Sequence, residues 1–222
     1  LLRERATTAL RAGVRLRDPQ TTRIRGDLVC GTGVEIDVNV VIEGSVTLED
    51  GVRIGAHSIV RNARIGKHTR IEPFSLVESS SVGESSVVGP YARIRPGSTV
   101  GDRVQIGNYV EIKSSRIGAG SRINHHSFIG DADVADRVTI GAGTITCNHD
   151  GVGNVQTVIE PDAYIGSGCN LVAPVRIGEG ATVGAGSTIT RDVPAAKLTL
   201  ARSQQTTIEN WQGPRSRREP RT

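Results

Sequence analysis

A six-residue period runs through most of this chain and restricts the folds open to it. Between Val88 and Gly143 an aliphatic residue returns every six positions, with two units of five residues, and glycine usually follows it. This period fits neither the 3.6-residue repeat of a helix nor the alternation of an ordinary strand. It is typical of a hexapeptide parallel β-helix, an all-β solenoid in which each unit supplies one short strand and one turn.

The same period places polar side chains in rows. With three units in each coil, residues about eighteen apart lie one rung, or about 4.8 Å, from each other. Arg95 and Lys113 are therefore predicted to stack, and Arg93, Glu111 and Phe128 are predicted to form a second row beside them. Two stacked cations repel unless an anion lies between them, and phosphate accepts hydrogen bonds from both side chains. The alternative is a solvated basic ladder without a ligand.

Composition limits the core, the compartment and the partners. Aromatic residues make up only 3 % of the chain, so the core must consist of stacked Ile, Val, Leu and Ala side chains. No apolar run is long enough for a membrane span and no signal peptide is visible. The three cysteines form no CxxC pair, which favours reduced thiols and a cytoplasmic protein. Four arginines crowd the tail, for which we expect a solvated end rather than a nucleic-acid partner.

The chain divides into three predicted segments. Residues 1–18 hold good helix formers and predict a short helical arm. Residues 19–196 predict the β-helix, although 14–33 carry only weak strand signals, and the polar stretch 146–158 interrupts the repeat as an inserted loop. Residues 197–222 form an irregular tail. Because the first residue is leucine, we expect the chain to be a piece of a longer protein.

Several motifs resemble one known family. The stretches GPYARIRPG, GNYVEIKSS, NHHSFIGDA, IGAGTITCN and LVAP, followed by a tail with one tryptophan, are similar to the C-terminal acetyltransferase domain of the bacterial bifunctional N-acetylglucosamine-1-phosphate uridyltransferase and glucosamine-1-phosphate acetyltransferase. The resemblance runs from about Leu10 to Trp211. It implies a left-handed β-helix, a homotrimer, and a cytoplasmic enzyme that acetylates glucosamine 1-phosphate from acetyl-coenzyme A, without a metal, for cell-wall precursors. It also implies an N-terminal uridyltransferase domain that is absent from this chain.

The resemblance assigns His125 as the general base, and the repeat register places Glu111 close enough to be its predicted orienting partner. Acyl transfer to an amine requires removal of a proton from nitrogen, and histidine titrates near neutral pH, which fits that role independently. The alternative is a turn histidine that only caps backbone groups. His126, beside it, is predicted to be structural or solvent-facing.

The other family positions fall on the acceptor and the coenzyme. Arg95 and Lys113 match the phosphate-binding pair. The coenzyme side takes in six positions, Ala142, Asn148, His149, Ser167, Ala185 and Arg202, and all of them except His149 match the family. Three acceptor positions depart from the family, with Phe128 in place of Tyr, Thr139 in place of Asn and Asn154 in place of Lys, and His149 also replaces a Tyr. Lost contacts of this kind cost about 1–3 kcal/mol each when a partner is left unsatisfied. We therefore expect weaker binding of glucosamine 1-phosphate.

Three alternatives stay open. The first keeps the chemistry and changes the acceptor to another amino-sugar phosphate. The second is a zinc hydratase on the same solenoid, which needs three converging histidines; the five histidines of this chain follow no ligand motif. The third is a non-catalytic trimeric scaffold. The trimer also has a physical motive, because coenzyme sites on such prisms form between subunits.

Overall fold

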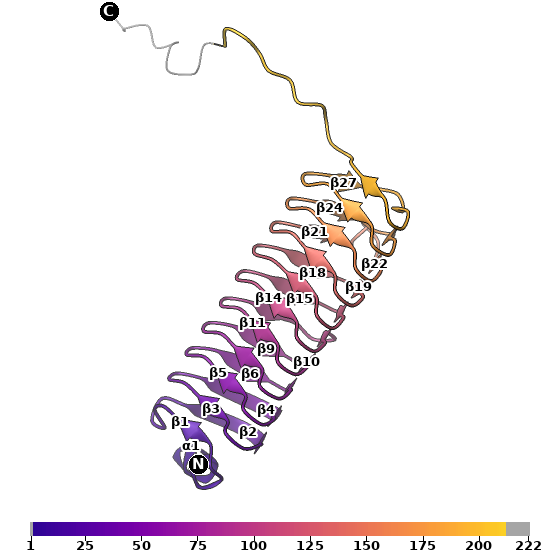
Figure 1. Ribbon diagram of the computed structural model, residues 1–222. Helices are drawn as coiled ribbons and strands as arrows, with labels where there is room; N and C mark the ends of the chain where they lie inside the picture. The colour runs from indigo at the N-terminus through magenta and orange to yellow at the C-terminus, as the bar shows by residue number, and fades with distance from the viewer. Residues whose placement is uncertain (1, 212–222) are drawn as a thin grey trace, which may run out of the picture.

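The chain folds into one long solenoid. The computed structural model describes residues 2–211, with helix α1 (Leu2–Arg11) at one end and the tail leaving the other (Figure 1). The short N-terminal helix is thus confirmed. It ends at Gly13, whose φ is +89°, with Val14 N donating to Ala9 O as in a glycine-capped helix end. The arginine-rich end of the tail, Arg215 to Arg221, lies outside the described residues.

Three parallel faces build the solenoid. Face 1 is an 11-stranded sheet made of β1 (Arg15–Leu16), β3 (Glu35–Ile36), β5 (Arg53–Ile54), β8 (Arg70–Ile71), β11 (Val87–Val88), β14 (Gln105–Ile106), β17 (Arg122–Ile123), β20 (Thr139–Ile140), β23 (Tyr164–Ile165), β26 (Thr182–Val183) and β28 (Leu198–Thr199). Face 2 contains β6 (Ile59–Arg61), β9 (Leu76–Glu78), β12 (Arg93–Ile94), β15 (Glu111–Lys113), β18 (Phe128–Gly130), β21 (Ile145–Cys147), β24 (Asn170–Val172) and β27 (Thr188–Ile189). Face 3 contains β7 (Arg64–Ile65), β10 (Ser81–Val82), β13 (Thr99–Val100), β16 (Arg116–Ile117), β19 (Ala132–Val134), β22 (Thr157–Ile159) and β25 (Val175–Ile177).

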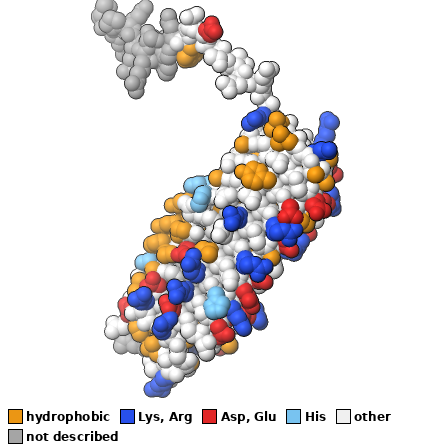
Figure 2. All heavy atoms as spheres, in the orientation of Figure 1, with side chains coloured by type: hydrophobic (Ala, Val, Ile, Leu, Met, Phe, Trp, Pro, Cys, Tyr) orange, Lys and Arg blue, Asp and Glu red, His pale blue; other side chains and the backbone are white. Residues whose placement is uncertain are grey.

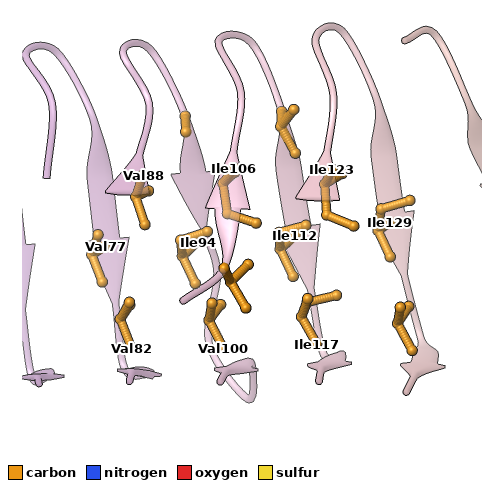
Figure 3. Packing of buried hydrophobic residues seen from close by; sticks show 14 of the residues in the cluster. Val77, Val82, Val88, Ile94, Val100, Ile106, Ile112, Ile117, Ile123 and Ile129 are labelled. Atoms are coloured by element: carbon orange, nitrogen blue, oxygen red, sulfur yellow. The ribbon is translucent and has the colours of Figure 1, made fainter. Parts of the chain in front are cut away.

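The aliphatic column predicted from the period is the core. Along face 2, Ile94 pairs with Ile112 and Ile112 with Ile129, and all three side chains are fully buried. Equivalent columns run inside the other two faces, so that three aliphatic stacks meet along the axis (Figure 3). A single unit has no second layer to cover its aliphatic side chain. Stacking of the coils therefore supplies most of the apolar burial.

The first coils differ from the prediction of weak strand signals. Strands β2 (Arg23–Cys30) and β4 (Val41–Leu48) are each eight residues long and pair along their whole length. Each strand serves faces 2 and 3 in turn and bends at a glycine, Gly26 or Gly44, with positive φ. A Cβ on Gly26 would lie 2.1 Å from Gly44 O, so this close approach requires glycine. The six-residue period continues through β4, from Ile42 to Leu48, but it does not show that a bend rather than an ordinary turn joins the two units.

The inserted loop leaves the solenoid where face 2 turns into face 3. It connects β21 to β22 and closes as a small hairpin, with an antiparallel bridge between His149 and Asn154. The backbone N–H groups of Gly153 and Val152 donate to the carboxylate of Asp150 and hold its pKa below the usual range. The loop therefore has an internal structure of its own and stands out from the regular coils.

Five exposed rings stack along one edge of the solenoid. We call this the ring ladder: His57, Phe74, Tyr91, Tyr109 and His126, with ring centroids 4.8–5.2 Å apart. Each ring is the third residue after a face 1 aliphatic side chain and has φ between 56° and 61°. Figure 2 shows a run of hydrophobic side chains along one edge with a histidine at each end. About half of the surface of Phe74, Tyr91 and Tyr109 is exposed, at 46–51 %.

Cys30 yields a prediction about thiol reactivity. Its side chain packs near α1, and burial raises the pKa of the thiol to about 11. Because the thiolate is the reactive form, we expect alkylation of Cys30 at pH 8 to be on the order of 100-fold slower than in the unfolded chain, where a thiol has a pKa of about 8.5. Mass spectrometry of iodoacetamide-treated protein with and without urea measures this ratio. Equal labelling rates would contradict the burial.

Among residues 2–211, no helix is long and apolar enough to span a lipid bilayer.

Candidate active site

The turn that joins face 1 to face 2, which we call the first corner, carries most of the predicted catalytic and coenzyme positions. His125, Ala142, Ser167 and Ala185 are each the second residue after a face 1 aliphatic residue. Backbone hydrogen bonds fix their order, because His125 O, Ala142 O and Ser167 O each accept from the next coil. The four residues therefore form one column that spans three rungs, or about 14 Å.

Arg202 ends this column. Its guanidinium Nη1 donates to Ala185 O over 2.9 Å, and its side chain is exposed. The tail is held at this level because Ala201 N donates to Ser187 Oγ over 3.2 Å. The structure thus places a free-standing cation at the C-terminal end of the column and an exposed imidazole, His125, at the other end.

Beside the column, the position that carries a ring in the earlier coils of the first corner is occupied by glycine in the later ones. Three glycines, Gly143, Gly168 and Gly186, occupy the ring-ladder position in the coils after His126. A Cβ on Gly168 or Gly186 would meet no atom within 4 Å, and one on Gly143 would meet only Gly168 backbone at 3.9 Å. We call these glycines, together with Ala142 and Ala185, the corner trough. None of these five residues carries a side chain larger than a methyl group.

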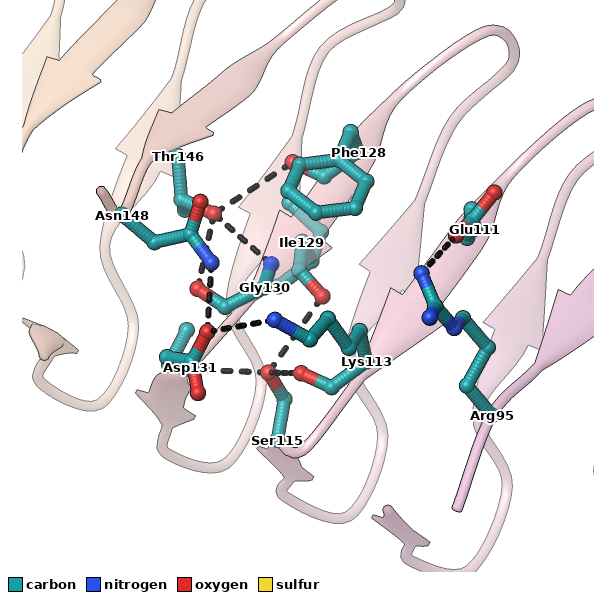
Figure 4. A network of polar contacts seen from close by, with 11 residues as sticks. Arg95, Glu111, Lys113, Ser115, Phe128, Ile129, Gly130, Asp131, Thr146 and Asn148 are labelled. Atoms are coloured by element: carbon teal, nitrogen blue, oxygen red, sulfur yellow. Dashed lines mark hydrogen bonds and ion pairs between the residues drawn. The ribbon is translucent and has the colours of Figure 1, made fainter. Parts of the chain in front are cut away.

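Four of the predicted residues lie on or beside face 2: Glu111 and Phe128 at the edge toward the first corner, and Arg95 and Lys113 at the edge toward the inserted loop. The register confirms that Arg93, Glu111 and Phe128 form one row and that Arg95 and Lys113 are neighbours in the next. Each of the two cations has its own carboxylate partner (Figure 4). Arg95 Nη1 lies 2.8 Å from Glu111 Oε1, and Lys113 Nζ lies 3.4 Å from Asp131 Oδ2.

These ion pairs relieve the repulsion between the stacked cations without a bound phosphate. Asp131 also accepts from Asn148 Nδ2, which ties the inserted loop to the same network (Figure 4). The Glu111 carboxylate, predicted to orient His125, accepts from Arg95 in this structure. A phosphate bound here must therefore share both cations with carboxylates of the chain, which lowers the attraction between the site and the phosphate.

Phe128 covers the middle of the network. A Cβ on Gly130 would lie 2.6 Å from Phe128 Cζ and 2.8 Å from Asn148 Nδ2, so glycine is needed beneath the ring. The ring lies between the ion pair of Glu111 and the loop residue Asn148 (Figure 4). An apolar surface thus occupies the place where the resemblance leads us to expect a hydroxyl group.

The remaining predicted residues lie elsewhere on the coil. Thr139 is on face 1, where it pairs with Arg122 and Tyr164. His149 and Asn154 face each other in the inserted loop, at the turn from face 2 to face 3. One chain therefore forms two separate groups. The first is the column of four residues that ends at Arg202, and the second is the face 2 network of ion pairs that includes Asn148. The same chain does not bring Thr139 or Asn154 to the first corner.

The ring ladder is the feature that the sequence analysis missed. His126 was predicted to be structural or solvent-facing, and the structure shows it as the last ring, stacked on Tyr109 at 4.9 Å. The signal was present, because all five rings hold the same place in their repeat units. Within the described part of the chain, no three His, Cys, Asp or Glu side chains are grouped as a metal site would need.

Comparison with known proteins agrees with this architecture. The family described as bacterial transferase hexapeptide (six repeats) matches residues 79–114 and 156–191. Among solved structures, the Arabidopsis UDP-N-acetylglucosamine acyltransferase superposes with a TM-score of 0.70 at 19 % identity, covering 80 % of this chain and 69 % of that one. LpxA from Acinetobacter baumannii gives 0.51 at 16 % identity, covering 78 % and 71 %. At these identities the likeness establishes the fold, a left-handed parallel β-helix, as predicted.

The repeats and the solenoid define the class: this chain is a hexapeptide-repeat domain. Within that class it is homologous to the C-terminal part of the bifunctional protein GlmU, which confirms the resemblance found in the motifs. It is 54 % identical to GlmU of Azoarcus sp. strain BH72 over 91 % of this chain and 45 % of the relative. The GlmU of Ralstonia pickettii is 53 % identical over 96 % and 47 %. The chain thus spans about half the length of these relatives.

Proposed function

We propose that this chain is an N-acetyltransferase that moves the acetyl group of acetyl-coenzyme A to the amine of glucosamine 1-phosphate, giving N-acetylglucosamine 1-phosphate for cell-wall precursors. The observation that carries the proposal is the column at the first corner, which aligns His125, Ala142, Ser167 and Ala185 with Arg202 at its end. Homology to GlmU at 53–54 % identity supports the same reaction.

The reaction forms one bond and breaks one. The amine nitrogen attacks the thioester carbonyl, the new C–N bond forms, and the C–S bond breaks to release the coenzyme thiolate. We assign His125 to accept the proton from nitrogen, since its imidazole is exposed at the end of the column. The proton then returns to the leaving sulfur. We assign the Ser167 hydroxyl to donate toward the developing oxyanion. No step is assigned to a metal ion.

The corner trough fits the coenzyme. Its glycine and alanine floor leaves room for the pantetheine arm, which a side chain on Gly168 or Gly186 would obstruct. Arg202, which is anchored to Ala185 O, offers its remaining guanidinium donors to a coenzyme phosphate. Asn148 and His149 are assigned to coenzyme contacts from the inserted loop. The coenzyme half of the site therefore has the shape and charge that the proposal requires.

The acceptor half supports a second candidate, the same chemistry on another amino-sugar phosphate. Arg95 and Lys113 are already paired with Glu111 and Asp131, and Phe128 places an apolar ring between them and the loop. These observations favour an acceptor whose binding depends less on contacts to its phosphate than the binding of glucosamine 1-phosphate does. We keep glucosamine 1-phosphate first because the cation pair itself is present.

A double variant distinguishes the two acceptors. Phe128→Tyr restores a hydroxyl group and Asn154→Lys restores a cation, and each restored contact contributes about 0.5–1.5 kcal/mol net. If glucosamine 1-phosphate is bound through these positions, its KM should fall on the order of 10–100-fold with coenzyme binding unchanged. The matched control carries Phe74→Tyr and Val29→Lys, which add the same groups at exposed positions outside the site. Equal KM values in native protein and double variant would contradict this assignment of the acceptor site.

We also propose that the working form is a homotrimer. In one chain, Thr139, the face 2 cations and Asn154 lie on different sides of the coil, so a neighbouring copy must complete the site. Residues 1–18 are then an arm leading to a further domain, 19–196 the acetyltransferase domain with the loop 146–158, and 197–222 a tail. Sedimentation over a dilution series measures the assembly. An active monomer would contradict the shared site.

A cytoplasmic location is part of the same proposal. The three cysteines are free thiols, which a reducing compartment maintains, and acetyl-coenzyme A is a substrate of that compartment.

Thiol release tests the proposed function. Native protein is mixed with acetyl-coenzyme A and glucosamine 1-phosphate, and free thiol is followed with each substrate omitted in turn. The expected result is release that requires both substrates. Thiol release that is indifferent to every amino-sugar phosphate would contradict the transferase assignment, and release only with a different amino sugar would establish the second candidate.

A further inference from the structure

Along the first corner, aromatic and imidazole rings give way to glycine, and His126 is the last ring before this change. The ring ladder fills the corner up to His126, and the corner trough begins one rung further at Gly143. Tyr109 covers one face of the His126 imidazole, at 4.9 Å and 22° between planes. The other face borders the trough, since Gly143 N bonds to His125 O directly above it.

The His126 ring cannot move along the solenoid axis toward the N-terminus, because the rings below it are stacked. Tyr109 rests on Tyr91 at 5.2 Å, and Tyr91 rests on Phe74 at 4.9 Å, so the ladder supports its last ring from below. The φ of His126 is 57°, which fixes the direction of its Cβ away from the helix core and toward solvent. An occupant of the trough therefore meets a supported aromatic surface at its N-terminal end.

The direction of the coenzyme brings its acyl group to this surface. Arg202 stands at the C-terminal end of the trough, three rungs from His125. If the coenzyme phosphates lie at Arg202, the thioester lies at the opposite end, beside Ala142 and His125. A carbon added to the acyl chain beyond the carbonyl then points to the level of His126, where the imidazole occupies the corner.

We propose that His126 is a specificity-determining residue that limits the transferred acyl group to acetyl. The inference rests on the function proposed above and adds the selection among acyl-coenzyme A substrates. The methyl group of an acetyl thioester contacts the ring face, whereas a propionyl or butyryl chain must displace a ring that is held by stacking. Discrimination of about 10–200-fold for one methylene group is the size that such a stop provides.

The test compares acetyl-, propionyl- and butyryl-coenzyme A by kcat/KM in native protein and in His126→Gly. We expect native protein to prefer acetyl over propionyl by about 10–200-fold and His126→Gly to lose most of that preference. Glycine suits the positive φ of this position, so the variant keeps the turn. The matched control is His57→Gly, which removes the ring at the other end of the ladder, at a φ of 60°, and should keep the native preference.

A second variant tests the support of the ring. Tyr109→Ala leaves His126 in place and removes the surface beneath it, so the acetyl preference should fall between those of native protein and His126→Gly. An unchanged preference in His126→Gly, or an equal loss in His57→Gly, would overturn the assignment of His126.

Calorimetric binding of the three thioesters separates this proposal from the proposed function. If native protein transfers no acyl group, the transferase assignment fails. The stop at His126 still predicts weaker binding of butyryl- than of acetyl-coenzyme A in native protein and equal binding in His126→Gly. Equal binding of all three thioesters to native protein would overturn it.

Discussion

Replacing His125 with alanine should slow acetyl transfer by about 10²–10⁴-fold, the usual contribution of a general base. The residue stands at the N-terminal end of the column, next to Ala142, where the proposal places the thioester. Coenzyme affinity should change little, because the proposal places the pantetheine arm and the phosphates along Ser167, Ala185 and Arg202. The loss should therefore appear in kcat and in kcat/KM for the acceptor, measured by thiol release.

A matched histidine variant separates a base from a structural residue. His125→Ala should lose most of its rate while it still binds the coenzyme, because no residue then accepts the proton of the amine. The control is His68→Ala, an exposed histidine on another corner of the solenoid, which should behave as native. A His125→Ala variant with native rate would remove the residue from the mechanism.

Replacing Ile106 with aspartate should abolish cooperative folding of the central coils. Its side chain is 2 % exposed and stacks between Val88 and Ile123 inside face 1. The substitution removes apolar burial and places a carboxylate in the aliphatic column without a partner. Such changes belong to the largest class of destabilisations, about 4–5 kcal/mol or more. Urea unfolding measures the loss, and hydrogen exchange should locate it in the neighbouring coils, because each repeat contacts only the next.

Two controls isolate the cause of this destabilisation. Gln105→Asp introduces the same charge one residue earlier, where the side chain points outward, and should change the free energy of unfolding by less than about 0.5 kcal/mol. Ile106→Val keeps an apolar side chain and should cost about 0.5–1.5 kcal/mol. A melting transition of Ile106→Asp equal to that of native protein would contradict the register of the core.

The period in the sequence predicts the regular coils because one rule sets both burial and pairing. Ile94, Ile112 and Ile129 are buried only if they stack on one another. Because Arg93, Glu111 and Phe128 each directly precede one of these residues, the same stacking places them in one row. The ion partners of Arg95 and Lys113 were not predicted. Each cation has carboxylates within reach on neighbouring rungs, and side-chain rotamers rather than the period decide between them.

Two other features were beyond the period for different reasons. The pairing of Asn148 with Asp131 depends on how the inserted loop folds, and this loop has no repeat to fix its position. Strands β2 and β4 each run through a bend, at Gly26 and Gly44, and the period does not show whether a bend or an ordinary turn joins two units. The ring ladder was within reach, since five rings share one place in the repeat. Each ring taken alone is an ordinary exposed residue, and only the shared place in the repeat predicts the stack.

The acceptor half of the site is the part in which this chain differs most from the family it resembles. Phe128, Thr139 and Asn154 replace three polar family residues, and the structure adds that Arg95 and Lys113 are both paired within the chain. On the coenzyme side the one departure from the family is His149 in place of Tyr. The proposal places the donor along the first corner and the acceptor on face 2, so recognition of the two can vary separately on this solenoid.

The most direct test of the central claim follows an isotopically labelled acetyl group from acetyl-coenzyme A by mass spectrometry. Native protein is incubated with labelled coenzyme and glucosamine 1-phosphate, beside His125→Ala. We expect the label in the amide of N-acetylglucosamine 1-phosphate, formed one for one with free thiol and nearly absent with the variant. If the coenzyme binds and no amino-sugar phosphate in a panel acquires the label, the chain is not the transferase proposed here.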